Sequence, residues 1–181
     1  RVGVDGALLA NLGASMKEIV NGSIFCACRL DQFEAALEDA QQRKPELLFV
    51  EASGLSDPTA IRTLLEQGNR YQGLRYRGCI ALADATSLHR VIDTARVCSR
   101  QLSMADLILL TKTDIATPQQ IAAARELLRQ RYPEVPALSI VGGEIPIDAV
   151  EALSTHRPAQ AADCRRDLTL QKYALSVSPG M

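Results

Sequence analysis

Short apolar runs alternate with amphipathic stretches along the chain. Four runs are predicted to form strands, and the first three are apolar at nearly every position, as expected for strands that are covered on both faces. They occupy residues 47–50, 79–83, 107–110 and 137–141. Strands that alternate with helices predict an α/β domain with a mainly parallel sheet flanked by helices.

Capping signals and helical spacing of apolar residues define the helices between these strands. The clearest start is Thr117-Pro118 with Gln120, where a capping residue precedes proline and a second capping side chain follows. The predicted helices cover residues 31–44, 57–68, 86–104, 117–132 and 147–153. Residues 155–168 are charged and irregular, which predicts a linker after a domain that spans residues 1–154.

Composition narrows the classes of partner. The chain has 181 residues, 20 Lys plus Arg against 21 Asp plus Glu, and a net charge of −1. This balance gives no electrostatic reason to expect nucleic acid or an anionic membrane as partner. No apolar run approaches the roughly 20 residues of a membrane span, and no signal peptide is visible. Five cysteines, an odd number, favour reduced thiols in the cytoplasm.

The residues Thr111-Lys112-Thr113-Asp114 follow directly after the strand predicted over 107–110. Ligands of open α/β sheets bind at the carboxyl ends of strands. The Asp114 carboxylate can accept hydrogen bonds from N1–H and the exocyclic amine of guanine, a pair that adenine lacks, while the Lys112 stem can lie along the base. Thr111, Lys112 and Asp114 are therefore predicted to bind guanine. The alternative is an ordinary charged surface loop.

A second polar segment, Glu51-Ala52-Ser53-Gly54, follows the strand predicted over 47–50. A carboxylate at the end of a buried strand can hold the water shell of Mg²⁺. Glycine three residues later gives the loop the backbone freedom to approach a terminal phosphate. Glu51 and Gly54 are thus candidates for hydrolysis of a nucleotide, and the alternative is a strand-end acid that caps a nearby amide.

A pair of cysteines, Cys26 and Cys28, follows Asn21-Gly22. On an extended segment, residues two apart point to the same side, so the pair could present two sulfurs together. Thiolates favour zinc, cobalt or nickel. Two sulfurs do not complete a site, so further ligands or a second copy of the chain would be needed. Small apolar packing residues and a redox pair are the alternatives.

Taken together, these segments resemble the CobW-type GTPases, relatives of the nickel-delivery GTPases of hydrogenase and urease maturation. The resemblance covers nearly the whole chain, and the Glu-Ala-Ser-Gly-Leu-Ser-Asp-Pro stretch is its most specific part. It rests on residues 2–9, on Glu18 with Asn21-Gly22 and the cysteines, on residues 51–58, and on Ala105-Asp106 ahead of Thr111-Lys112-Thr113-Asp114.

The resemblance implies a P-loop NTPase-like fold and hydrolysis of GTP with Mg²⁺, coupled to binding or insertion of zinc, cobalt or nickel. Glu51 and Gly54 would then sense hydrolysis, and Cys26, Cys28 and Glu18 would hold the metal. The implied partners are GTP, the metal ion and a client metalloprotein or corrinoid protein, with a homodimer as a further expectation. A smaller C-terminal domain would begin within residues 169–181.

The chain departs from the family pattern in two places. The family has Cys-x-Cys-Cys, whereas Ser23 and Phe25 stand at its first two cysteines, Cys26 matches the last, and Cys28 has no counterpart. The sequence also has no G-x-x-x-x-G-K-[ST] loop. We expect the first strand and this phosphate loop to lie upstream of Arg1, and the chain alone to bind GTP weakly.

A rival hypothesis is a non-catalytic regulatory or binding module that keeps the fold and uses the altered cysteine motif to act on a protein or corrinoid partner.

Two further residues are predicted to be structural. Cys79 belongs to a buried strand and is expected to pack in the core. Asp84 ends that strand and could reach the nucleotide, but capping of the helix from Thr86 is the more ordinary role.

Overall fold

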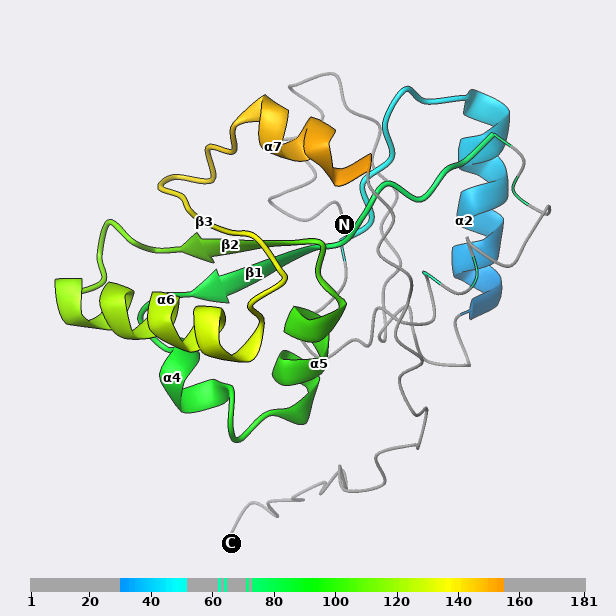
Figure 1. Ribbon diagram of the computed structural model, residues 1–181. Helices are drawn as coiled ribbons and strands as arrows, with labels where there is room; N and C mark the ends of the chain where they lie inside the picture. The colour runs from blue at the N-terminus through cyan, green and yellow to red at the C-terminus, as the bar shows by residue number, and fades with distance from the viewer. Residues whose placement is uncertain (1–29, 52–61, 63, 65–70, 72, 155–181) are drawn as a thin grey trace, which may run out of the picture.

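The computed structural model describes residues 30–51, 62, 64, 71 and 73–154 (Figure 1). Three strands and five α-helices are found within these ranges, with one 3-10 helix at the end. They are α2 (Leu30–Arg43), β1 (Ile80–Asp84), α4 (Leu88–Val91), α5 (Arg96–Met104), β2 (Leu107–Thr111), α6 (Pro118–Arg131), β3 (Ala137–Ser139), α7 (Ile147–Glu151) and η2 (Ala152–Ser154).

The three strands form one parallel sheet in the order β1-β2-β3. β2 lies in the middle, with Asp84 of β1 opposite Thr111 and Ser139 of β3 opposite Leu110. Each pair of neighbouring strands is joined through helices, as parallel pairing requires. The predicted α/β domain with a mainly parallel sheet and flanking helices is therefore confirmed in the described part of the chain.

Helices cover β2 on both faces (Figure 1). On one face α4, α5 and α6 pack on the sheet, and their buried cluster includes Ala81, Ala83, Leu88, Leu102, Ile108, Leu110, Ala124 and Leu128. On the other face α7 and η2 pack on Leu107, Leu109, Ile140 and Leu153. Because successive side chains of a strand point to opposite faces, the continuous apolar run 107–110 places two side chains in each cluster.

The start of α6 follows the predicted capping chemistry. The Thr117 hydroxyl accepts from the Gln120 N–H at 3.2 Å, and the Gln120 side chain accepts from the Thr117 N–H at 2.8 Å. Pro118 then occupies the first turn, where its missing N–H would have no helical partner. This reciprocal cap fixes the point at which the chain leaves the β2 edge and enters the helix.

The prediction of a strand over residues 47–50 is wrong. These residues belong to no strand, and their side chains are exposed, with Phe49 72% and Leu47 53% accessible. A run of apolar residues does not determine whether another strand is available to pair with it. None of the described strands pairs with this segment. Without such a pairing, four consecutive apolar residues are left at the surface.

The helix predicted over 86–104 is instead two helices, α4 and α5. The Thr94 hydroxyl donates to the Arg90 carbonyl at 3.0 Å and to the Val91 carbonyl at 3.3 Å, so the side chain competes for acceptors near the end of α4. The chain then restarts from Ala95, which is extended. Asp93 and Thr94 are weak helix formers, which adds to the break.

Other bounds shift by a few residues. β1 includes Asp84, and β3 ends at Ser139 and not at residue 141. β1 is also less covered than predicted, because Leu82 is 70% exposed while α7 and η2 cover β2. The helices predicted over 31–44, 117–132 and 147–153 are confirmed. The predictions for residues 1–29, for most of the helix over 57–68 and for residues 155–181 concern residues that the structure does not describe.

No helix in the described ranges combines the length and apolar character that crossing a bilayer demands.

The burial of β2 leads to a stability prediction with an internal control. Leu109 is 0% exposed, whereas Leu82, its register partner on the same face, is 70% exposed. Leu109→Ala should lower the free energy of unfolding by about 3 kcal/mol, because it leaves a cavity between β2 and α7. Leu82→Ala should lower it by less than about 1 kcal/mol. Urea denaturation measures both, and equal losses would contradict the assigned packing.

Candidate functional site

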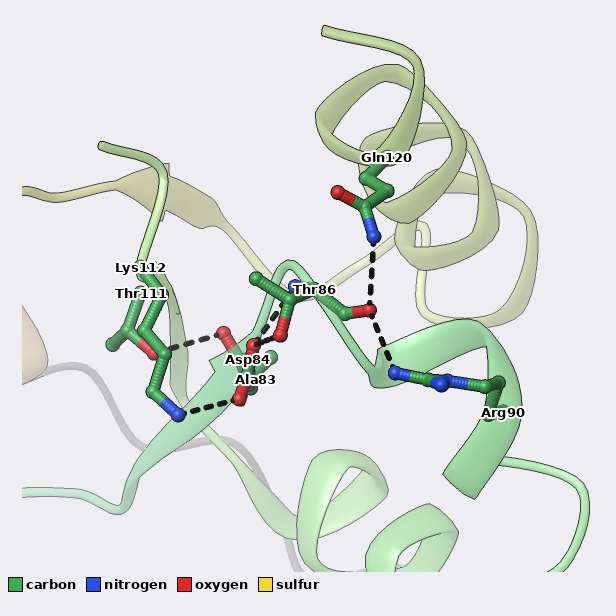
Figure 2. Close-up of polar contacts among 7 residues, drawn as sticks. All are labelled: Ala83, Asp84, Thr86, Arg90, Thr111, Lys112 and Gln120. Atoms are coloured by element: carbon green, nitrogen blue, oxygen red, sulfur yellow. Dashed lines mark hydrogen bonds and ion pairs between the residues drawn. The ribbon is translucent and has the colours of Figure 1, made fainter. Parts of the chain in front are cut away.

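The carboxyl ends of β1 and β2 form one polar edge (Figure 2). Thr111 and Asp84 are register partners there. The Thr111 hydroxyl donates to the Ala83 carbonyl at 3.2 Å, and the Ala85 N–H donates to the Thr111 carbonyl at 3.1 Å. These bonds continue the strand pairing past the last residues of the strands, so the segments that follow begin at fixed positions.

Lys112 turns the chain sharply after β2. Its φ is +58°, a left-handed conformation that costs a non-glycine residue about 1 kcal/mol. The N–H groups of Ile115 and Ala116 both donate to the Lys112 carbonyl, at 3.3 and 3.1 Å, and close the turn. The Lys112 ammonium then reaches the neighbouring strand end, where Nζ lies 2.7 Å from Asp84 Oδ2 (Figure 2).

The Asp84 carboxylate is held by several donors. Its Oδ1 accepts from the Thr86 N–H at 2.8 Å and from the Thr86 hydroxyl at 2.6 Å. Partial burial would raise the pKa of Asp84, but the hydrogen bonds from Lys112 and Thr86 outweigh it and lower the pKa to about 2. Asp84 is therefore ionised throughout the neutral range, and its charge offsets that of Lys112.

Thr86 connects this pair to two helices. Its carbonyl accepts from Gln120 Nε2 of α6 at 3.3 Å and from Arg90 Nη2 of α4 at 3.4 Å (Figure 2). Gln120 is also the third residue of α6 and takes part in its cap. The Asp84–Lys112 pair is thus tied, through Thr86, to the starts of the helices that leave the sheet edge.

Asp114 lies in the turn after Lys112, and its side chain is exposed. The described part of the chain supplies no hydrogen bond or ion pair to this carboxylate. The preceding residue fixes the turn, because the Thr113 hydroxyl donates to the Ile140 carbonyl at 2.9 Å. Ile140 in turn donates its N–H to Leu110 of β2 at 2.9 Å. The turn is therefore anchored to the segment that follows β3.

That segment leads into Gly142 and Gly143, which have φ values of +61° and +80°. An added Cβ at either glycine would meet nothing within 4 Å. Both glycines are needed for their backbone conformation, because left-handed φ values are unfavourable for other residues. Three segments with polar side chains or glycines thus follow the ends of β1, β2 and β3.

The structure brings together Thr111 and Lys112 of the predicted base site, with Asp114 in the same turn. Glu51 is exposed, and no hydrogen bond or ion pair joins it to this turn within the described ranges. Gly54 and the predicted metal ligands Glu18, Cys26 and Cys28 lie outside the described residues.

The described residues contain no group of three or more His, Cys, Asp or Glu side chains arranged to hold a metal. Burial and the negative charge of Asp106 raise the pKa of the Cys79 thiol to about 11, against an opposing effect of Arg62. Burial also raises the pKa of the Cys98 thiol, which packs against the larger core cluster. Since metals bind the thiolate, both cysteines are better suited to packing than to metal binding.

The fold and this strand-end site define a class of protein. The crystal structure of the Zn(II)-bound YjiA GTPase from E. coli superposes with a TM-score of 0.57 at 24% identity, over 70% of this chain and 40% of that one. This chain therefore has the P-loop NTPase-type fold, a mainly parallel sheet with helices on its faces.

The chain belongs to the CobW/HypB/UreG family, whose nucleotide-binding domain model matches residues 1–139. The zinc chaperone YeiR of Escherichia coli K12 is 32% identical over 71% of this chain and 40% of its own length. The zinc chaperone YjiA of the same strain is 29% identical over 81% of this chain and 47% of its own. The chain thus spans less than half of these relatives, and the predicted family is confirmed.

The sequence analysis underestimated the role of Asp84. The predicted helix cap is wrong, because α4 begins at Leu88 after Ser87 without a side-chain cap. Asp84 instead accepts from Thr86 in a local turn, and its second oxygen binds Lys112. A signal was present in the sequence, since an acid ends the strand before the one that leads into Thr111-Lys112. Parallel neighbours end at the same edge, so a charge pair between the two ends was open to prediction.

The low pKa of Asp84 predicts how stability varies with pH. A folded-state pKa below the ordinary 3.8 means that ionised Asp84 stabilises the fold above that pH, and that this contribution disappears as the pH falls toward about 2. Asp84→Asn cannot titrate. The wild-type advantage in free energy of unfolding should be about 1 kcal/mol at pH 6, after allowance for solvent screening, and should shrink below pH 4.

Denaturant unfolding of both proteins across this pH range measures the difference directly. A difference that stays constant from pH 6 to pH 2 would contradict the assigned ionisation of Asp84.

Proposed function

We propose that this chain is the nucleotide-binding part of a GTP-hydrolysing metallochaperone, which couples its nucleotide state to binding or insertion of a transition metal. The observation that carries the proposal is the anchored turn after β2. It presents an exposed Asp114 carboxylate beside a Lys112 side chain whose ammonium is already engaged. Membership of the CobW/HypB/UreG family supports the same reading.

The turn suits guanine for a reason of hydrogen-bond chemistry. The Asp114 carboxylate can accept from both N1–H and the exocyclic amine of guanine, and adenine leaves that carboxylate unpaired. Thr111 and Thr113 hold the turn to β1 and to Ile140, so the backbone that carries Asp114 does not have to be ordered when the base arrives. A prearranged backbone of this kind reduces the entropy lost on binding.

Hydrolysis is assigned to Glu51 and Gly54. Glu51 is an exposed carboxylate after the apolar segment 47–50, and Mg²⁺ in nucleotide sites commonly uses one or two carboxylates with the phosphates and water. The ion would supply neutralisation of phosphate charge when bound. Glu51 would orient its water shell, and the loop to Gly54 would respond to the presence of the terminal phosphate.

The metal that is carried would bind Cys26 and Cys28, with Glu18 as a further ligand. The relatives YeiR and YjiA are named zinc chaperones, which favours zinc over cobalt and nickel for this chain. A change in the loop after Glu51 would alter the grip of the sulfur pair on the ion. A client metalloprotein or corrinoid protein would receive the metal, a second copy of the chain could complete its ligand set, and the cytoplasm is the proposed location.

The guanine assignment is tested by exchanging one atom of Asp114. In Asp114→Asn, an amide N–H replaces one of the two carboxylate oxygens. This N–H would face the exocyclic amine of guanine, which is also a donor, whereas xanthine has a carbonyl at the same ring position and can accept from it. Measured in the full-length protein, the affinity of Asp114→Asn for GTP should be roughly a hundredfold lower than that of the wild type. Affinity for xanthosine triphosphate should rise, and ATP should bind weakly throughout. Equilibrium titration with fluorescent nucleotides measures all three.

The matched control is Asp148→Asn, the same change at an exposed aspartate on α7. It should leave the preference for GTP over ATP unchanged. Wild-type protein that binds GTP and ATP equally, or an Asp114→Asn variant with unaltered preference, would remove the guanine assignment and with it this function.

A second candidate is a binding module that keeps the fold but does not hydrolyse nucleotide. One sequence observation favours it, namely the presence of Ser23 and Phe25 at family cysteine positions. In this candidate the altered cysteine segment contacts a protein or corrinoid partner and holds no metal ion.

Zinc binding by Cys26 and Cys28 distinguishes the metallochaperone from the binding module. If Cys26 and Cys28 are ligands, Cys26→Ser and Cys28→Ser should each weaken zinc binding by roughly tenfold or more, because a hydroxyl replaces a thiolate. Cys98→Ser is the matched control and should bind zinc as wild type does, since that thiol is partly buried against the core. Competition with a chromophoric zinc chelator measures the affinities. Unchanged zinc binding in both variants would favour the module.

A further inference from the structure

The Lys112 side chain is anchored at both of its ends. At the backbone, two N–H groups bind the Lys112 carbonyl and hold the left-handed turn. At the tip, Nζ lies 2.7 Å from Asp84 Oδ2. Because Asp84 is the register partner of Thr111, the four-carbon stem must run from the end of β2 toward the end of β1, along the edge of the sheet.

The two oxygens of Asp84 divide their partners. Oδ1 accepts both bonds from Thr86, which close the local turn after β1, and Oδ2 binds Lys112. Thr86 is itself held by Gln120 and Arg90 from two helices. The carboxylate that receives the lysine is therefore fixed by the fold before any ligand is present (Figure 2).

An isolated lysine at the rim of a site would keep its ammonium in water and its stem would sample many rotamers. Here the ammonium has a fixed acceptor, although the Lys112 side chain is 56% exposed. The pairing removes rotamer freedom from the stem and keeps the positive charge at the β1 end. The methylene groups of the Lys112 stem therefore form an ordered apolar surface beside the turn that contains Asp114.

We propose that Asp84 is a positioning residue of the nucleotide site, which holds Lys112 so that its methylene stem forms the surface on which the purine base rests. This inference rests on the proposed guanine-binding function and deepens it. Asp84 does not touch the base. It acts through Lys112, so its whole effect on nucleotide affinity should depend on the presence of the lysine ammonium.

A double-mutant cycle tests that dependence. Asp84→Asn keeps an oxygen for Thr86 and loses the charge that binds Lys112, while Lys112→Met keeps an apolar stem and loses the ammonium. Each single variant should weaken binding of fluorescent GTP by roughly two- to fivefold, the size expected for a partly exposed ion pair. The double variant should be no weaker than either single one, because both changes break the same contact.

Glu126→Gln is the matched control. Glu126 forms an ion pair with Arg129 at the same 2.7 Å separation, on the exposed surface of α6. Loss of a carboxylate there should leave GTP affinity unchanged, which separates the effect of the Asp84–Lys112 pair from a general effect of net charge. If Asp84→Asn does not fold by circular dichroism, Asp84→Ser, whose hydroxyl can still accept from Thr86, takes its place in the cycle.

The outcomes separate this inference from the function on which it rests. Losses that multiply in the double variant, or an Asp84 variant with wild-type affinity, would overturn the positioning role while Asp114→Asn still switches base preference. If Asp114→Asn leaves base preference unchanged, the guanine-binding function itself fails. Single losses that do not multiply, together with a silent Glu126→Gln, support the proposal.

Discussion

The packing of β2 on both faces is the constraint on which the rest of the described structure depends. A strand without an exposed face must satisfy its backbone through neighbours on each side, and β1 and β3 supply them in parallel. Parallel strands end at a common edge. The residues that follow β1, β2 and β3 are consequently gathered in one place, and the polar contacts of Asp84, Thr111 and Ile140 follow from that arrangement.

Much of this arrangement could be predicted from sequence because its causes are local. The apolar run 107–110 identified the central strand, and Thr117-Pro118 with Gln120 identified the start of α6 to the residue. The segment Thr111 to Asp114 was placed at a strand end, where the structure has it. Signals of this kind are contained in a few consecutive side chains and need no information about distant partners.

The errors have a non-local cause. The segment 47–50 has the composition of a buried strand, but composition does not provide a pairing partner, and its side chains are exposed. The Asp84–Lys112 contact joins residues 28 positions apart, so no local pattern contains it. At the break between α4 and α5 the Thr94 hydroxyl bonds to backbone carbonyls and Ala95 is extended, features that the spacing of apolar residues does not reveal. The metal ligands named from sequence remain predictions.

The side-chain amide of Gln120 has a consequence for which residues this position tolerates. Its oxygen accepts from the Thr117 N–H while its nitrogen donates to the Thr86 carbonyl, so one group joins a helix start to the sheet edge. In most reciprocal caps glutamate serves as well as glutamine. Here, ionised glutamate would have no donor for the Thr86 carbonyl and would place a negative charge next to that oxygen. Evolutionary exchange between these two residues should therefore be restricted here, even though the helix alone would permit it.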